Sequence, residues 1–223
     1  MPVKLSSVKC PSCGTALEGK VADRVYLCNC GVMHTRDDEG KREVKYTIAA
    51  PKDPSAPPQS IIYIPFWRLD SDVAIHYSRS EGGFFSKLFG KDWKGGRVSI
   101  YIPAVNWDPG TFKHWAGTVT SNPPQVRPVQ EFGAYERDAV VIDEVEAQQL
   151  ADFLILTFEA EKPGVLQQIS YEVKVFDMSL LYMPFNRSGS SFTPAISIGA
   201  KALNSIRPLK GASSWRYGSQ HRT

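Results

Sequence analysis

The 223-residue chain has no stretch of about 18 consecutive apolar residues, the length that a membrane-spanning helix needs. Its first residues contain no apolar run of signal-peptide length, so we expect a cytoplasmic protein. Neither sign of charge is in large excess, and a formal net charge of +3 does not by itself indicate a nucleic-acid partner. With 42% hydrophobic and 22% charged residues, the composition predicts one sizeable core, or a small domain beside a larger one.

The common sequence motifs of enzyme sites are absent. There is no glycine-rich dinucleotide loop, no Walker-type loop, no Gly-x-Ser-x-Gly and no His-Glu-x-x-His. Only four histidines occur, His34, His76, His114 and His221, and His114 beside Trp115 is the best remaining candidate for acid–base chemistry. Nothing nearby identifies a partner for it, so we expect a structural or surface histidine and a protein that is not an enzyme.

Asp70 and Asp72 flank Ser71 in what we predict to be a hairpin turn. Carboxylates in turns usually accept hydrogen bonds from turn amides, and we favour that role over a divalent-metal site.

Cysteine is scarce, and all four cysteines lie between positions 10 and 30. They form two close pairs, Cys10-Pro11-Ser12-Cys13-Gly14 and Cys28-Asn29-Cys30-Gly31. Disulfides are rare in a reducing compartment, so the pattern indicates a metal site. Zinc prefers four thiolate or imidazole ligands in a tetrahedron, and the glycine after each pair lets backbone amides turn toward the sulfurs.

This segment resembles the zinc-ribbon superfamily over about residues 8–35. The resemblance implies one structural zinc ion held by Cys10, Cys13, Cys28 and Cys30. Four protein ligands leave no open coordination position, and metal binding would supply the folding energy of so short a unit. The second pair is Cys-x-Cys where the family usually has Cys-x-x-Cys, so His34 is a reserve ligand for a Cys₃His site. A degenerate, metal-free site is the third alternative.

Proline and glycine divide the remainder of the chain. Four prolines between positions 51 and 58 predict a stiff linker that holds the ribbon away from the rest, with an ordered arm packed along the main domain as the alternative. The predicted units are a zinc ribbon (1–48), a Pro-rich linker (49–60), a first β module (61–125), a second β module with a helix (126–209) and a flexible basic tail (210–223).

A repeated sequence motif suggests that the two β modules are related. Tyr63-Ile64-Pro65-Phe66-Trp67-Arg68 recurs as Tyr182-Met183-Pro184-Phe185-Asn186-Arg187, with a shorter version at 101–104. A convergent strand ending is the alternative to a true duplication. Because proline cannot donate to a strand ladder, we expect each strand to end, bulge or lie at an edge there.

Hydrophobic periodicity predicts a mainly antiparallel α+β fold. Alternation predicts strands at 73–78, 97–102, 169–175, 180–183 and 192–198, with a turn at Asp177-Met178. One long helix is predicted at about 143–161, capped by Asp143 and Glu146. Its apolar stripe consists of Ala147, Leu150, Ala151, Leu154 and Phe158.

This mixture resembles uncharacterised bacterial proteins that join a zinc ribbon to β modules containing Pro-Phe-Trp. The cysteine pairs, the Tyr-x-Pro-Phe-x-Arg pair and Glu146-Ala147 carry the resemblance. It implies no known reaction.

One aromatic and basic segment predicts a contact surface. Its residues are Phe84, Phe85, Lys87, Leu88, Phe89, Lys91, Trp93 and Lys94. On a helix the aromatic residues would share one side and the lysines the other, which suits an anionic membrane surface. The alternative is that the aromatics pack on the β domain or on a protein partner.

The charges of the C-terminal half are unevenly spread. Residues 128–163 contain nine acidic and two basic residues, and residues 201–223 contain five basic and no acidic residues. The two alternatives are that both stretches are simply solvated, or that one docks on the other, within a subunit or between subunits of a homo-oligomer. The basic tail also contains Trp215 and Tyr217, a combination that binds single-stranded nucleic acid in some proteins.

Together these patterns favour a non-enzymatic zinc-binding scaffold that engages a protein partner. Peripheral membrane binding through 84–94 and nucleic-acid binding by the ribbon and tail are the alternatives.

Overall fold

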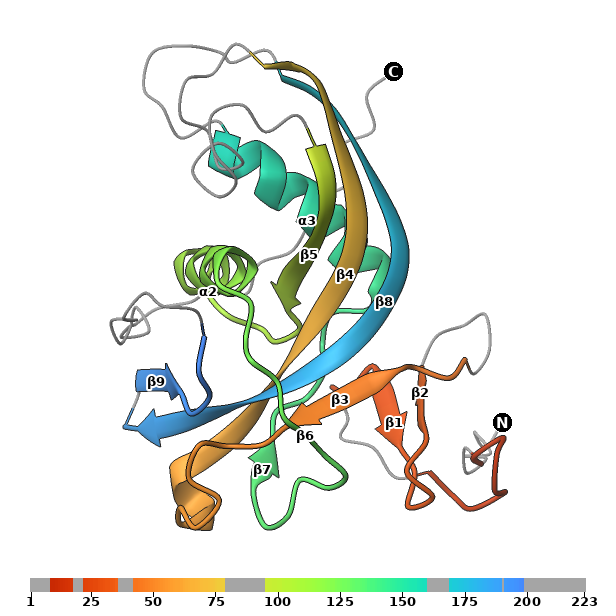
Figure 1. The fold of residues 1–223 in the computed structure, drawn as a ribbon. Coiled ribbons are helices and arrows are strands. Elements are labelled where there is room, and N and C mark those ends of the chain that lie inside the picture. Colours follow the sequence, from red (N-terminus) through yellow and green to blue (C-terminus); the bar gives the residue numbers. More distant parts are fainter. Residues whose placement is uncertain are drawn as a thin grey trace, which may run out of the picture.

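The computed structural model of the chain describes residues 9–17, 22–35, 42–78, 95–159, 169–189 and 191–198. Within these residues a small hairpin, β1 (Val25–Leu27) and β2 (Met33–Thr35), lies beside a seven-stranded sheet. Two long curved strands, β4 (Ile61–Ser78) and β8 (Ile169–Ser188), run side by side through the centre of this sheet (Figure 1). Among the described helices, none combines the length and apolarity needed to cross a membrane.

The sheet is mostly antiparallel, as predicted. Its order is β5 (Gly95–Pro103), β4, β8, β3 (Tyr46–Ala49) and β6 (Pro128–Val129). Two short strands lie off this path: β7 (Glu136–Arg137) pairs in parallel with β4, and β9 (Ser191–Pro194) pairs antiparallel with β8. The ladder between β4 and β8 extends from Ile61 opposite Asn186 to Ser78 opposite Ile169. The strands that were predicted for the two β modules therefore share one sheet.

Both faces of the sheet are covered, because β4 carries apolar side chains on alternate positions of both faces. Tyr63, Trp67 and Leu69 point into one core cluster, together with helix α3 (Glu144–Glu159). Ile64 and Phe66 point into a second cluster, together with helix α2 (Pro109–Ser121). The order of layers is thus helix, sheet and helix, and the β1–β2 hairpin joins the layer that contains α3.

The hairpin packs directly on the sheet, with Val25, Met33 and Val44 in the same buried cluster as α3. The segment after it, predicted as a stiff linker, makes the contacts of the ordered-arm alternative. The Ala50 amide donates to the Arg127 carbonyl over 2.8 Å, and the Lys52 amide donates to the Ala195 carbonyl over 2.7 Å. The proline content of the segment favoured an extended linker. Composition does not reveal that carbonyls distant in the sequence accept hydrogen bonds from its amides.

The two Tyr-x-Pro-Phe-x-Arg copies lie next to each other on β4 and β8. Tyr63 is directly opposite Pro184, and Pro65 is directly opposite Tyr182. The carbonyl of Pro65 accepts from the Ala104 amide over 2.9 Å, and the carbonyl of Pro184 accepts from the Ala195 amide over 2.8 Å. The two copies therefore make equivalent backbone contacts on the outer sides of the central strand pair.

The prediction that each strand would end, bulge or lie at an edge at its proline was wrong for Pro65 and Pro184, whereas β5, at the end of the sheet order, ends at Pro103 as predicted. Pro65 and Pro184 lie inside central strands. Each proline carbonyl faces the outer side of the strand pair, and the missing N–H would face the same way. On that side β4 pairs first with β7, up to Tyr63, and then with β5, from Phe66 onward. Pro65 lies in the gap between these two partner strands. No bond between β4 and β8 is lost.

Two further predictions about the central strands were wrong. Asp177-Met178 does not form a turn, because β8 is continuous from Ile169 to Ser188 with a change of register beside Asp177. Asp70 and Asp72 do not lie in a hairpin turn either, since both are within β4 beside the same irregularity. A bulge adds a residue without reversing the chain, and in a sequence its polar residues look like those of a turn.

Helix α3 confirms the predicted long helix in the described residues. The Asp143 carboxylate accepts a hydrogen bond from the Glu146 amide over 2.8 Å, as the predicted cap requires. Ala147, Ala151 and Leu154 are buried. Residues 160 and 161, at the predicted end of the helix, lie outside the described residues.

Helix α2 was not predicted. Its start is well marked, since Asp108 accepts from the amides of Gly110 and Thr111 and Pro109 occupies the first turn. Its interior contains threonine, valine and glycine, which have modest helix propensity. Tertiary contacts compensate for this modest propensity. Trp115 and Val119 are buried against the sheet, and the Thr120 hydroxyl oxygen accepts a hydrogen bond from the Tyr101 amide of β5.

Candidate metal centre

The cysteines lie on two tight backbone turns, as the spacing predicted. In the first turn the Gly14 amide donates to the Cys10 carbonyl over 2.9 Å. In the second turn the Gly31 amide donates to the Cys28 carbonyl over 2.9 Å. Gly14 and Gly31 have φ angles of 75° and 84°, a region that residues with a Cβ rarely adopt. The two glycines therefore adopt the tight-turn backbone conformation that the sequence predicted for them.

The four sulfur atoms converge on one point. The Sγ atoms of Cys10, Cys13, Cys28 and Cys30 all lie within 4.8 Å of one another, and all four are free of disulfides. Cys10 Sγ is 3.8 Å from Cys30 Sγ, and Cys13 Sγ is 3.4 Å from Cys28 Sγ. A tetrahedral zinc with Zn–S bonds of about 2.3 Å has S···S edges of about 3.8 Å. The predicted cluster of potential metal ligands is confirmed, and its dimensions suit a four-coordinate ion.

The thiols differ in acidity. Hydrogen bonding by the Thr15 side chain, and then by its backbone, lowers the pKa of Cys13 to about 6. Burial raises the pKa of Cys10, but backbone hydrogen bonds at Cys13 and Ser12 outweigh it and lower that pKa overall. For Cys28, a backbone hydrogen bond at Cys30 lowers the pKa, yet burial and neighbouring sulfurs raise it to about 12 overall.

The lowered pKa values of Cys10 and Cys13 come from hydrogen bonds, whereas burial and neighbouring sulfurs raise the pKa of Cys28. Four thiolates in so small a volume would repel one another. Such a group cannot be fully ionised without a compensating positive charge. A bound cation supplies that charge and deprotonates its thiol ligands outright. The donor set therefore suits a thiophilic dication.

His34, the predicted reserve ligand, lies against the cluster. It is on β2 opposite Tyr26 and is 2% exposed. Its Nε2 is 3.2 Å from Cys10 Sγ, and its buried Nδ1 has no hydrogen-bond partner among the described residues. The imidazole does not belong to the group of ligand atoms that all lie within 4.8 Å of one another.

A buried ion pair attaches the hairpin to the sheet. Asp23, which is 1% exposed, accepts a hydrogen bond from the Val140 amide over 2.9 Å. Its other oxygen is 2.8 Å from Nη2 of Arg137 on β7. The Arg24 amide also donates to the Val140 carbonyl over 2.6 Å. The sequence did not predict a role for Asp23 or Arg137. The only sequence signal for this ion pair was that Arg137 is one of two basic residues in an acidic stretch.

A second attachment reaches the metal-ligand turn itself. The Tyr46 hydroxyl of β3 donates to the Gly31 carbonyl over 2.7 Å. The Tyr46 ring lies edge-on to the ring of Tyr182, with centroids 6.5 Å apart. Burial raises the pKa of Tyr182, and its hydroxyl lies 3.8 Å from Met33 Sδ of β2. The cysteine cluster is thus connected to the central strands through aromatic side chains.

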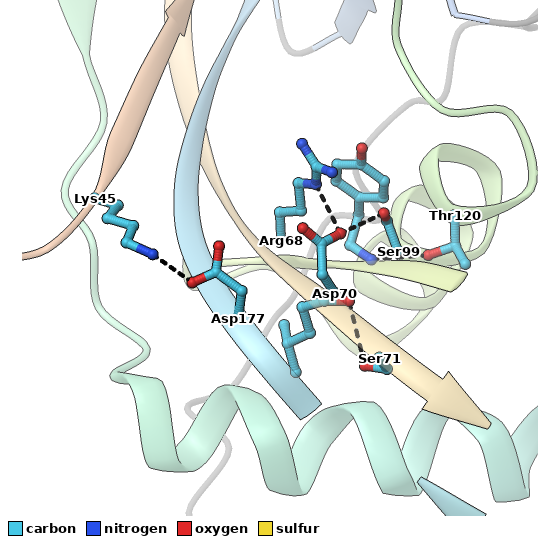
Figure 2. A network of polar contacts seen from close by, with 9 residues as sticks. Lys45, Arg68, Asp70, Ser71, Ser99, Thr120 and Asp177 are labelled. Atoms are coloured by element: carbon cyan, nitrogen blue, oxygen red, sulfur yellow. Dashed lines mark hydrogen bonds and ion pairs between the residues drawn. The ribbon is translucent and has the colours of Figure 1, made fainter. Parts of the chain in front are cut away.

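The other candidate residues do not converge. Figure 2 shows Asp70 between Arg68 and Ser99, both of which donate to its Oδ1, while Asp177 pairs with Lys45 over 2.6 Å. These contacts satisfy the two carboxylates locally and do not bring them together with a histidine.

The histidines are also dispersed. His114 lies on α2 with its Nε2 3.4 Å from Thr118 Oγ1, and burial lowers its pKa. His76 is exposed and lies 3.9 Å from the Glu172 carboxylate. Among the described residues no catalytic set forms around either histidine. The predicted contact segment 84–94 and the basic tail 210–223, with His221, lie outside the described residues.

No protein-family model matches the chain, and no curated protein and no solved structure matches it either.

Proposed function

We propose that Cys10, Cys13, Cys28 and Cys30 hold one structural zinc ion in a non-enzymatic scaffold protein that engages a protein partner. The observation that carries the proposal is the convergence of four free sulfurs within 4.8 Å of one another. Thiolates are the ligands that tetrahedral zinc prefers, and four of them fill its coordination shell. A closed shell leaves no position for a substrate, so the ion acts on the fold.

In this proposal His34 is a hydrogen-bond donor to the zinc-bound Cys10 thiolate. A distance of 3.2 Å between Nε2 and Sγ suits an N–H···S contact, and all four sulfurs already converge without the imidazole. Donation to a metal-bound sulfur orients the ligand and reduces its negative charge. His34 thus supports the site from outside the coordination shell.

The metal is tested on the purified full-length protein by elemental analysis and cobalt substitution. We expect one zinc per chain, and a cobalt spectrum typical of four thiolates that Cys28→Ser changes and His34→Gln preserves. Iron in place of zinc, a spectrum that loses a nitrogen ligand in His34→Gln, or no retained metal would contradict the proposed site.

The partner proposal is supported by the position of the ligand turns. Ser12 and Asn29 are exposed, one in each turn, while the strands behind them are anchored in the core. Rigid exposed turns present a defined surface to another protein. Deletion of residues 1–48 would remove part of the core, so the sharper variant is Ser12→Arg with Asn29→Asp, which changes only the exposed turns.

The measurement is co-purification from the native cell with quantitative mass spectrometry. We expect a defined partner that the double variant loses and that a matched Ser55→Arg variant, exposed on the arm, retains. Equal recovery of every protein by the double variant would contradict binding through the ligand turns.

Membrane and nucleic-acid binding remain hypotheses about residues 84–94 and the tail. Co-sedimentation with anionic liposomes that falls in Phe85→Ser/Phe89→Ser would support the first. Nucleic-acid binding with a steep salt dependence would support the second.

A further inference from the structure

Helix α3 exposes large apolar side chains on its outer face and also has an apolar buried face. Val145 is 62% exposed and Leu156 is 44% exposed, and Phe153 beside them is also exposed. At 3.6 residues per turn, Val145 and Leu156 lie within about 20° of each other around the helix axis. The buried residues Ala147 and Leu154 lie on the opposite side. Gln149 and Asp152 lie between Val145 and Leu156 on this side. The solvent side therefore combines exposed apolar residues with polar ones, whereas a surface helix normally has mainly polar residues there.

The same helix is acidic. It contains Glu144, Glu146, Asp152 and Glu159 and no basic residue. Arg42 pairs with Glu144 over 3.0 Å at the first turn. Asp152 accepts a hydrogen bond from the Tyr171 hydroxyl over 2.7 Å, which leaves its negative charge in place. An occupant of this face must combine apolar side chains with positive charge.

A second copy of α3 does not fit this requirement. Packing α3 against α3 would bring acidic residues together without counter-charges, which is unfavourable in a desolvated contact. The chain itself contains two segments that combine basic and aromatic residues, 84–94 and 201–223, and only 201–223 has no acidic residue. Residues 201–223 have five basic and no acidic residues, together with Trp215 and Tyr217.

We propose that the outer face of α3 is a docking surface for the chain's own segment 201–223, within the same molecule. The segment follows Ile198, the last described residue, whose backbone pairs with Pro124. The 25 residues from 199 to 223 span up to about 80 Å when extended, whereas α3 with its 16 residues is about 24 Å long. A folded chain of this length has a radius of gyration of about 17 Å, so α3 lies within reach.

Covalent attachment favours this occupant over a free one. A tethered segment is present at an effective concentration in the millimolar range, so a weak contact suffices to fill the face. Burial of Val145 and Leu156 provides the apolar contribution, and lysine or arginine beside Asp152 provides the electrostatic one. The proposal does not depend on the zinc site.

Zero-length carbodiimide cross-linking of the full chain tests the proposal. This chemistry joins an amine to a carboxylate in direct contact, and the only lysines of the segment are Lys201 and Lys210. Mass spectrometry should find them joined to carboxylates of α3. In an equal mixture of ¹⁴N- and ¹⁵N-labelled protein, the joined peptides should carry a single isotope, because docking is intramolecular.

Substitutions on the face provide the specificity test. Val145→Ser with Leu156→Ser should reduce these cross-links on the order of tenfold or more, since each removes a buried apolar contact. Gln149→Arg, which places a positive charge at the centre of the face, should reduce them as well. The matched control is Val126→Ser with Val129→Ser, the same change at exposed residues outside α3, and it should leave the cross-links unchanged.

Three results would overturn the proposal. They are the absence of cross-links between the segment and α3, cross-links that survive both sets of substitutions in α3, and cross-links that join chains of different isotopes. The last result would assign the face to the segment of a second copy. Circular dichroism of each variant verifies that α3 remains folded.

Discussion

Tyr63 on β4 lies directly opposite Pro184 on β8, so the first residue of one Tyr-x-Pro-Phe-x-Arg copy faces the proline of the other. Pro65 and Tyr182 make the reciprocal pair. The pair at the centre of this arrangement is Ile64 opposite Met183. On the outer sides, Phe66 faces Pro103 of β5 and Phe185 faces Pro194 of β9. The two copies thus form an approximately two-fold arrangement, with corresponding neighbours on both sides.

This arrangement predicts that Pro65→Ala and Pro184→Ala have similar costs. Each substitution restores an N–H that points to a buried gap between two outer strands, where it lacks a ladder partner. An unsatisfied buried N–H destabilises a protein by about 1–3 kcal/mol. Urea denaturation should show both losses, and Pro54→Ala on the exposed arm should cost clearly less. A neutral result at either proline would show that an acceptor is present.

Removal of the metal should destabilise the sheet as well as the hairpin. Val25 and Met33 of the hairpin are buried in the same cluster as the central strands, so the loss of the ligand turns exposes part of that cluster. We expect a chelator to lower the melting temperature of the whole described fold, which should still unfold in one transition. Near-ultraviolet circular dichroism of the core aromatic residues measures this transition. Two separate transitions, with that of the core unchanged, would contradict this coupling.

Tyr46→Phe should accelerate metal release. It removes the hydroxyl that donates to the Gly31 carbonyl next to Cys30, at a cost of about 0.5–1.5 kcal/mol. Zinc transfer to a chromogenic chelator measures the rate. Tyr135→Phe is the control, because that hydroxyl donates to the carbonyls of Pro54 and Ala56, away from the cysteines. Equal rates in both variants would mean that the Tyr46 hydroxyl does not support the metal site.

The Asp23–Arg137 pair should be among the most sensitive positions of the fold. Asp23→Asn or Arg137→Met leaves one buried charge without its partner, which costs about 3–5 kcal/mol. The double variant should recover part of this loss, because no unpaired charge remains. Urea denaturation of the four proteins in a double-mutant cycle provides the coupling energy, and additive losses would contradict the pairing.

Asp108→Ala should destabilise α2 by about 0.5–2 kcal/mol, the usual cost of an N-cap. Hydrogen bonding at Thr111, first from its side chain, lowers the pKa of Asp108 below its ordinary value of 3.8. The contribution of the ionised carboxylate is therefore complete above about pH 3.8 and is lost as the pH falls through the lower folded-state pKa. The stability difference between wild type and variant should shrink in acid, and a constant difference would contradict this explanation.

Local chemistry was predictable from the sequence because it involves residues that are close along the chain. The cysteine spacing predicted a shared site, and the φ angles of Gly14 and Gly31 agree with the role assigned to those glycines. The Asp143 cap of α3 depends on a residue three positions away. Helix α2 was missed because its interior has modest propensity, although Asp108-Pro109 marks its start.

By itself, the sequence determined the set of potential metal ligands, the turns that present them and the amphipathic character of α3. Only the tertiary structure decided that Asp23 meets Arg137, that Tyr46 reaches Gly31 and that the two proline motifs face each other. These contacts depend on the register between β4 and β8 and on distant segments that meet at the sheet. No local pattern encodes such a register, because it results from the packing of both apolar faces at once.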